Sequence, residues 1–168
     1  PGGQLAGEQL VGALDDRERL TELVEACDVT TFEIEAVATS ALEVLVSRGC
    51  LVRPAPSVLA CIQDKLLQKQ RLADAGVPTA DFAAVDAPDA RALADFGLPL
   101  VQKARRGGYD GRGVAVFTGA VVEERVLLVP SLVERFVDFR CELAVLVART
   151  SDGHCRTWPV VEMVFDEA

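Results

Sequence analysis

The sequence predicts a mixed α/β (α+β) fold arranged in more than one lobe. Segments with helical spacing alternate with short apolar segments of strand type, and Gly or Pro stands at many of the junctions. Half of the 168 residues are hydrophobic, which is enough for one sizeable core or for two or three smaller ones. Toward the middle, two apolar segments flank a Gly- and Arg-rich stretch, which predicts a β-hairpin.

The first third is expected to alternate helix and strand. The Asp15-Asp16 pair can cap a helix, and residues 27–34 form an apolar run that predicts a strand. Ser40 is the expected cap of a second helix, which Gly49 would close. A short apolar segment then leads to Pro54, where we expect a boundary between lobes.

The strongest helical pattern covers residues 57–76, where Val58 and Ile62 belong to one apolar stripe. Lys65 and Lys69 project onto the same stripe. A lysine on a buried face must either extend its ammonium group to water or meet an anion, and the pattern leaves both open.

The remaining segments complete the mixed pattern. Residues 98–102 and 114–117 are the expected arms of the hairpin. Further β-type segments are expected at 82–85, 127–139, 141–149 and 157–165. One helix is expected at 86–96.

Charge and hydropathy exclude several classes of partner. Lys and Arg number 17 against 26 Asp and Glu, a net charge of −9, which argues against nucleic acid because phosphate backbones need a basic face. No apolar run approaches the roughly 18 residues of a membrane span, and the first residues are no signal peptide. We expect a cytoplasmic chain without a membrane partner.

The five cysteines form no Cys-x-x-Cys pair and are odd in number, so we expect buried free thiols rather than structural zinc or a disulfide framework. The single histidine, His154, lies in a turn signal and is expected to be exposed.

Residues 103–113 carry four glycines, three arginines and a lysine within an acidic chain. Glycine lets backbone N–H groups turn toward an anion and the cations supply charge, so the stretch fits a phosphate cradle; a solvated hairpin tip fits the composition equally well. Neither the P-loop motif nor the Rossmann glycine motif occurs.

Several motifs, in their order along the chain, resemble the ATP-grasp superfamily, and within it the family of N5-carboxyaminoimidazole ribonucleotide synthetases, ATP-dependent carboxylases of purine biosynthesis. The motifs are Gly2-Gly3-Gln4-Leu5, Thr31-Phe32-Glu33-Ile34-Glu35, Gln63-Asp64-Lys65 with Gln68-Lys69, Gly107-Gly108-Tyr109-Asp110-Gly111-Arg112-Gly113, Glu134-Arg135-Phe136-Val137 followed by Glu142, and Trp158-Pro159-Val160-Val161-Glu162.

The resemblance implies an ATP-grasp fold with a truncated Rossmann-like N-terminal (pre-ATP-grasp) lobe. It would divide the chain into a partial pre-ATP-grasp domain at 1–56, an ATP-grasp N-lobe with a Gly-rich lid at 57–133 and the start of the C-lobe at 134–168.

The resemblance also implies roles for individual residues. Lys65 and Lys103 would touch the phosphates of ATP, and Glu142 would hold the ribose hydroxyls. The lid over the phosphates would consist of Gly108, Tyr109, Asp110, Gly111, Arg112 and Gly113; the hinge that reads adenine would consist of Glu134 and the backbone of Arg135, Phe136 and Val137. Tyr109 and Arg112 would also be catalytic, near the bicarbonate-derived group, whereas Gly3, Gln4 and Glu35 would bind the aminoimidazole ribonucleotide.

The function implied is carboxylation of 5-aminoimidazole ribonucleotide by bicarbonate, through carboxyphosphate, with release of ADP and phosphate. ATP and Mg²⁺ are the implied cofactors, and a homodimer is common in the family. Two alternatives stay open: a non-catalytic nucleotide-binding or scaffold relative, and another ATP-grasp ligase such as a formate-using ribonucleotide transformylase.

The chain also departs from the family pattern. It lacks a strand before Gly2 and a helix and strand after Val11, and Met163 and Phe165 stand where family members often carry Asn and His. The family's magnesium ligands would follow Ala168, so no metal ligand is expected in this chain. We expect a portion of a longer polypeptide; a reduced relative without catalysis is the alternative.

Overall fold

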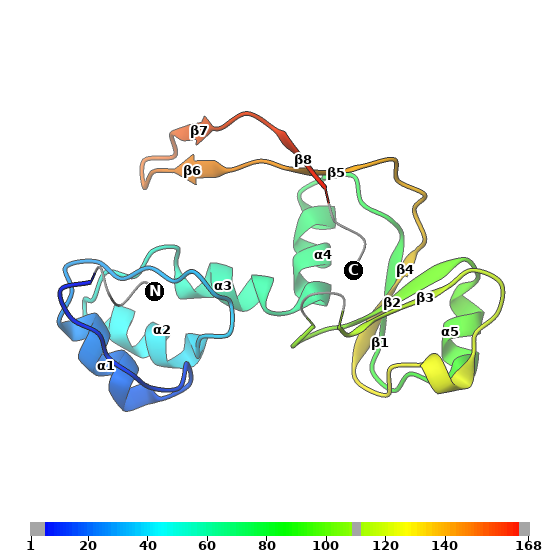
Figure 1. Cartoon of the computed structure of the whole chain (residues 1–168), viewed down its shortest axis with the longest axis horizontal. Helices are drawn as coiled ribbons and strands as arrows, with labels where there is room; N and C mark the ends of the chain where they lie inside the picture. The colour runs from blue at the N-terminus through cyan, green and yellow to red at the C-terminus, as the bar shows by residue number, and fades with distance from the viewer. Residues whose placement is uncertain (1–5, 109–111, 165–168) are drawn as a thin grey trace. The chain divides into compact units, whose positions relative to one another are not determined.

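The computed structural model describes residues 6–108 and 112–164, in two compact units (Figure 1). Unit 1 is Pro1–Phe136 and unit 2 is Val137–Ala168. Helices and antiparallel sheet are both present, which confirms the expected mixed α/β (α+β) fold. Within the described ranges, none of the helices has the length and apolar character needed to cross a membrane.

Unit 1 begins with three short helices around a small core. The carboxylate of Asp16 caps α1 (Arg17–Glu25), as expected, by accepting hydrogen bonds from two amides of the first turn. α2 (Thr39–Ser47) and α3 (Pro56–Ile62) follow. The core that these helices share consists of Val24, Val37, Leu42, Leu45, Val52 and Leu59.

Two expectations for this region were wrong. Residues 27–34 form no strand; Thr30 makes only an isolated parallel bridge to Val52, because the chain bends at 33–34 and turns at 35–36 instead of staying extended. Ser40 does not cap α2, which begins after Ala38, and its hydroxyl instead accepts a 3.4 Å hydrogen bond from Arg17.

The long helix expected at 57–76 is two helices. α3 ends at Ile62 and α4 (Lys65–Asp74) begins after Asp64, whose backbone is extended at φ −120° and ψ 106°. The Asp64 carboxylate accepts from the amides of Leu66 and Leu67, so it starts a new helix rather than continuing the old one. Apolar periodicity runs across this break and does not reveal it.

The second part of unit 1 is a four-stranded antiparallel sheet. Its strands are β1 (Phe82–Val85), β2 (Leu100–Ala104), β3 (Val114–Phe117) and β4 (Ser131–Arg135), in the order β1-β4-β2-β3. β2 pairs with β3 from Leu100↔Phe117 to Lys103↔Val114, which confirms the hairpin around the Gly-rich stretch.

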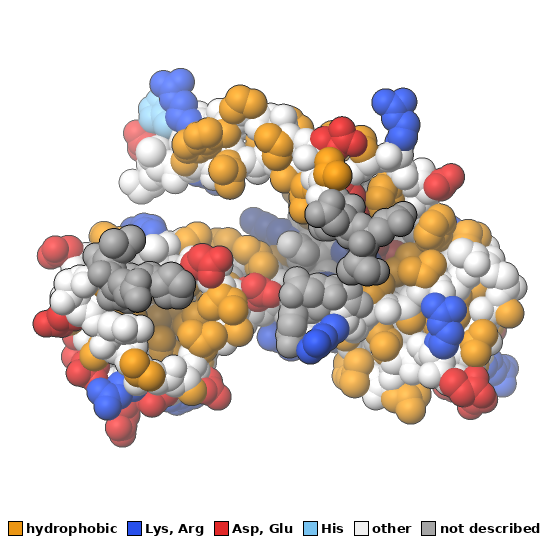
Figure 2. All heavy atoms as spheres, viewed as in Figure 1, with side chains coloured by type: hydrophobic (Ala, Val, Ile, Leu, Met, Phe, Trp, Pro, Cys, Tyr) orange, Lys and Arg blue, Asp and Glu red, His pale blue; other side chains and the backbone are white. Residues whose placement is uncertain are grey.

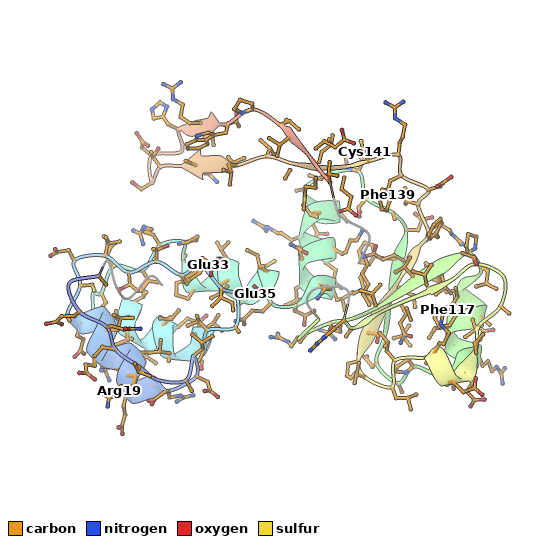
Figure 3. The ribbon with its side chains drawn as sticks, in the orientation of Figure 1. Arg19, Glu33, Glu35, Phe117, Phe139 and Cys141 are labelled. Carbon is orange, nitrogen blue, oxygen red and sulfur yellow. The ribbon has the colours of Figure 1, made fainter. Side chains whose placement is uncertain are left out.

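One face of the sheet is covered by α5 (Ala90–Phe96) and the segment with the short 3-10 helix η2 (Glu123–Arg125). Leu93 of α5 is almost fully buried there. So is Phe117 of β3, which is labelled in Figure 3. α4 contacts β4. Because side chains alternate along a strand, Lys103 and Glu134 face away from the α5 side, where the neighbouring Gln102 and Val133 are buried.

Unit 2 is a hairpin interrupted once, so the continuous strand expected at 141–149 is two strands. β5 (Glu142–Ala144) pairs with β8 (Val161–Met163), and β6 (Val147–Arg149) pairs with β7 (Cys155–Thr157). Between the ladders, residues 145–146 oppose residues 158–160, so the register shifts by one. Pro159 lies in the longer arm, where a missing N–H is tolerated.

The exposure of the cysteines and of the histidine can also be compared with expectation. All five cysteines are free, but none is buried: Cys27, Cys141 and Cys155 are exposed and the other two are intermediate. The side chain of His154 is exposed, as expected, with Nε2 3.5 Å from a carboxylate oxygen of Asp152.

Candidate functional site

A cleft of about 280 Å³ in unit 1 joins three segments that are far apart in the sequence. Its lining residues are Glu35, Ala36, Ile62, Gln63, Lys65, Arg106, Gly107 and Gly108. Three of the residues singled out in the sequence, Glu35, Lys65 and Gly108, therefore lie around one cavity, although 73 positions separate the first of them from the last.

The Glu35 segment is fixed to the end of α3 by an amide side chain. Gln63 Nε2 donates to the carbonyl oxygens of Glu35 at 2.6 Å and Val37 at 2.8 Å. Glu35 itself is exposed beside α3 (Figure 3). The main chain at one face of the cleft is therefore held by the Gln63 side chain, and the Glu35 carboxylate is left exposed.

The two arms of the Gly-rich loop meet at Gly108 and Gly113. A Cβ atom on Gly108 would lie only 2.7 Å from the carbonyl oxygen of Arg112, and Gly113 has a φ of +73°. The Gly113 carbonyl accepts from the amide of Ala104 at 2.8 Å. Only glycine allows this close approach, so the loop has a narrow base.

Lys65 reaches the base of this loop. It is the first residue of α4, and its Nζ donates to the carbonyl oxygen of Gly108 at 3.2 Å. The ammonium group thus stands at the cleft, held by a neutral acceptor, with capacity for further hydrogen bonds to an anion.

Two further lysines share one buried carboxylate. Glu134 Oε2 lies 3.0 Å from Lys103 Nζ and 3.5 Å from Lys69 Nζ, and the Glu134 side chain is only 10% exposed. Lys69 also donates to the hydroxyl of Thr79. Of the two options that the sequence left open for Lys69, an anionic partner is confirmed, and that anion belongs to the protein.

The residues after Glu134 contribute mainly to the fold. The Arg135 guanidinium donates to the carbonyl oxygens of Gly97 and Leu98 at 3.0 and 3.4 Å, and its amide donates to Asp81. The Phe136 amide donates to the carbonyl of Pro99. These two N–H groups are therefore already used within the fold.

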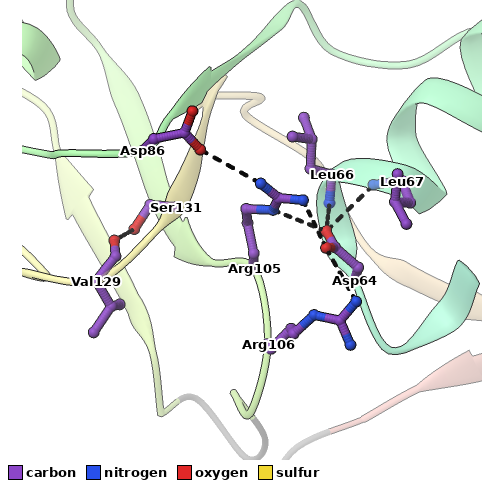
Figure 4. Close-up of polar contacts among 8 residues, drawn as sticks. All are labelled: Asp64, Leu66, Leu67, Asp86, Arg105, Arg106, Val129 and Ser131. Atoms are coloured by element: carbon purple, nitrogen blue, oxygen red, sulfur yellow. Dashed lines mark hydrogen bonds and ion pairs between the residues drawn. The ribbon is translucent and has the colours of Figure 1, made fainter. Parts of the chain in front are cut away.

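A charged cluster that the sequence did not predict lies beside the cleft (Figure 4). Asp64 is 2% exposed and is paired with Arg105 and Arg106, the two residues before the glycines. Burial alone would raise the pKa of the Asp64 carboxyl group; the hydrogen bonds from Arg105 and from the helix amides, with the charge of Arg105, lower that pKa below its ordinary value. The signal in the sequence was an Asp at a cap position inside an apparently continuous helix.

Several other predicted residues lie outside the described part of the chain or belong to unit 2. Gly3, Gln4, Tyr109, Asp110 and Gly111 lie outside the described residues, as does Phe165, and Arg112 is described as exposed. Val137, Glu142 and Met163 belong to unit 2, where Glu142 pairs with Met163 across β5 and β8.

No metal site is formed by the part of the chain that the structure describes, because no three of its His, Cys, Asp or Glu side chains gather in a suitable group. None of the described residues is therefore assigned to Mg²⁺.

Comparison with known proteins identifies the domains to which the chain is similar. Residues 70–167 match the model of the ATP-grasp domain, and residues 1–63 match that of the ribonucleotide synthetase preATP-grasp domain. The chain is 39% identical over 168 residues to the N5-carboxyaminoimidazole ribonucleotide synthase of Synechococcus elongatus, covering 96% of this chain and 42% of that protein.

Solved structures give the same result. The crystal structure of N5-carboxyaminoimidazole ribonucleotide synthetase from Thermotoga maritima matches with a TM-score of 0.86 and 38% identity, covering 97% of this chain and 44% of that one. The synthase from Aspergillus clavatus, in complex with ADP and 5-aminoimidazole ribonucleotide, matches with a TM-score of 0.83 and 29% identity, covering 99% and 45%.

The chain thus spans less than half the length of the relatives it matches. The predicted domain boundaries at 56/57 and 133/134 stay predictions. The family is shown independently of them, because the domain model alone covers more than half of the residues. The chain belongs to the ATP-grasp family.

Proposed function

We propose that the chain contributes to an ATP-dependent carboxylase that converts 5-aminoimidazole ribonucleotide and bicarbonate to N5-carboxyaminoimidazole ribonucleotide. The observation that carries the proposal is the cleft in which Glu35, Lys65 and Gly108 meet. In this proposal the Lys65 side holds phosphate and the Glu35 side holds the ribonucleotide, with the outermost phosphate between them.

The phosphate end of the proposal is supported by the cations. Lys65 and Arg106 line the cleft, and phosphoryl transfer depends on positioned cations and backbone donors more than on covalent groups of the protein. Lys103, the second proposed phosphate ligand, is held on β2 by Glu134. An ordered ammonium group loses less conformational entropy on binding than a free one.

The loop from Gly108 to Gly113 is the proposed lid over the phosphates. Its narrow glycine base is where a change of backbone angles costs least, which suits a segment that admits ATP and then excludes water. Exclusion of water matters here because carboxyphosphate hydrolyses readily. Tyr109 and Arg112 of this loop are the proposed contacts to the bicarbonate-derived group.

The remaining contacts of ATP are also proposals. Carbonyl oxygens of Arg135 and Phe136 would accept from adenine, with Val137 beside them, and Glu142 would hold the ribose. Gly3 and Gln4 would join Glu35 at the ribonucleotide. The resemblance to the family also implies Mg²⁺ with ATP, and no step is assigned to the metal.

The proposed chemistry has two steps. A bicarbonate oxygen attacks the γ-phosphorus of ATP, the bond to the β-phosphate oxygen breaks, and carboxyphosphate and ADP form. The exocyclic amine of the ribonucleotide then attacks the carboxyl carbon, or the CO₂ released from it, losing a proton as phosphate departs. The cations at the cleft would stabilise the charge that moves onto the phosphate oxygens in the first step.

Release of ADP by the longest polypeptide that contains this chain, measured with ATP, bicarbonate, Mg²⁺ and 5-aminoimidazole ribonucleotide, tests the proposal. Turnover that depends on the ribonucleotide is expected, and its absence would overturn the carboxylase assignment. Calorimetry with ATP then separates the alternatives, because binding without turnover favours a non-catalytic relative. Turnover with formate in place of bicarbonate favours a transformylase.

Lys103→Ala tests the phosphate role. We expect it to weaken ATP binding by about tenfold or more, since an ion contact to phosphate is lost. Arg91→Ala is the matched control, because the Arg91 side chain is a cation that is 90% exposed on α5, away from the cleft. Equal affinity in the two variants would contradict a phosphate contact by Lys103.

A further inference from the structure

We propose that Asp64 is a positioning residue that ties the base of the glycine-rich loop to the start of α4 and so sets where Lys65 stands relative to Gly108. The inference rests on the proposed function in one respect: the ligand whose binding it would govern is the phosphate chain of ATP. The tie itself is a property of the ligand-free protein.

One carboxylate engages two elements at once (Figure 4). Oδ1 accepts from the Leu66 amide at 3.0 Å, which begins α4, and from Arg105 Nε at 3.1 Å. Oδ2 accepts from Arg105 Nη2 at 2.8 Å and lies 3.5 Å from Arg106 Nη2. Arg105 therefore presents a two-pronged contact, which fixes orientation as well as distance.

The main chain repeats the same connection. The amide of Lys65, the residue after Asp64, donates to the carbonyl of Arg105 at 2.9 Å, and the Arg105 amide donates to Pro130 at 3.1 Å. Helix start and loop base are thus joined by a side-chain link and a main-chain link. With both in place, Lys65 Nζ reaches the Gly108 carbonyl at 3.2 Å.

A helix cap alone does not account for a charged residue here. A cap needs only a side-chain oxygen, which Asn supplies as well as Asp. A carboxylate that is 2% exposed is costly unless it is paired, and here the arginines pair it. Asp16 caps α1 by the same pattern, accepting from amides two and three residues later, in an exposed setting. The charge at Asp64 therefore serves the loop.

The test compares Asp64→Asn with Asp16→Asn in the full chain. Both changes keep a capping oxygen and remove one charge. Amide hydrogen exchange is measured at Lys65 and Arg105 without ligand, and calorimetry gives the affinity for a non-hydrolysable ATP analogue. Asp64→Asn should speed exchange at both amides and weaken binding by about tenfold, whereas Asp16→Asn should leave both within about twofold.

Arg105→Lys is the second variant, because it keeps the charge and loses the two-pronged contact. It should speed amide exchange and weaken binding, each by a smaller factor than Asp64→Asn. If Asp64→Asn does not fold, Arg105→Lys alone tests the positioning role. Unchanged exchange, unchanged affinity or an equal response in Asp16→Asn would each overturn the positioning role. Failure of the unaltered chain to bind the analogue would instead overturn the proposed function, and the exchange data would still decide the tie.

Discussion

The sheet of unit 1 and the hairpin of unit 2 are both antiparallel, yet they bury their apolar residues very differently. Leu100, Leu132 and Val133 of the sheet are 0% exposed, whereas Leu143 and Trp158 of the hairpin are 62% and 53% exposed. Figure 2 shows the hydrophobic side chains of the hairpin at the surface. Strand pairing satisfies the backbone, but only a second layer removes side chains from water.

The same contrast holds for polar groups. The buried Gln102 amide donates to the carbonyl of Leu127 at 2.8 Å and to the Ser131 hydroxyl at 3.1 Å, and it accepts from the Leu127 amide at 2.9 Å. At the turn of unit 2, Thr150 and Asp152 form their hydrogen bond in an exposed setting. A buried polar group is costly unless it is hydrogen-bonded, so the position of Gln102 depends on its partners more strictly than an exposed turn does.

The largest difference between the two regions should appear in the free energy of unfolding when a leucine of each is truncated to alanine. Leu100→Ala is expected to lower the free energy of unfolding by about 3 kcal/mol, because it leaves a cavity in a closed core. Leu143→Ala should change it by less than about 0.5 kcal/mol. Urea unfolding followed by circular dichroism measures both, and similar losses in the two variants would contradict the contrast in burial.

A smaller effect is expected in how the contribution of Asp64 to stability changes with pH. The pKa of Asp64 is lower in the folded chain than its ordinary value of 3.8, so the carboxylate stabilises the fold above that pH, and this contribution is lost as the pH falls through the folded value. Asp64→Asn should therefore cost about 2 kcal/mol near neutral pH and progressively less in acid. Unfolding free energies measured at several pH values give the difference.

Asp152→Asn is the control for this pH dependence. Its hydrogen bond from Thr150 also lowers the pKa of Asp152, but the side chain is exposed. We expect its substitution to leave the acid transition of the whole chain unchanged. A pH dependence as large as that of Asp64→Asn would remove the distinction between the two settings.

The smallest effect should come from two glycines with positive φ. Gly97 closes α5 with φ 93° and ψ 145°, a conformation open almost only to glycine, so Gly97→Ala should cost about 1 to 2 kcal/mol in unfolding of unit 1. Gly153, with φ 90°, lies in the turn of unit 2. Gly153→Ala should mainly speed amide exchange at Trp158, which pairs with Leu146. A larger loss of overall stability in Gly153→Ala would contradict this assignment.

Local signals predicted the local structure. The caps, apolar runs and glycines were sufficient for α1, α5 and the β2–β3 hairpin, because the interactions that decide these elements lie within a few residues. The order β1-β4-β2-β3 was not predictable in this way. It places β4 between two strands that precede it, and such pairing depends on the packing of the whole sheet.

Some residues of the candidate site were predictable from the sequence, and others were not. Lys65, Gly108 and Glu35 were found through the resemblance and do lie around one cleft. The motif around Asp64 does not predict its role, because that role depends on Arg105, which is 41 positions away. Likewise, the partner of Lys69 is Glu134 on β4, and no spacing within α4 points to it.

The Glu134 carboxylate should make the ion pairs of Lys69 and Lys103 insensitive to ionic strength. Around a chain of net charge −9, dissolved salt enriches cations rather than anions, so two neighbouring ammonium groups would find few mobile counter-ions. Glu134 is a counter-ion fixed in the sequence, and as a largely buried one it is screened little. Added salt should weaken exposed ion pairs such as Arg19–Glu22 at a lower concentration than it weakens the pairs of Lys69 and Lys103 with Glu134.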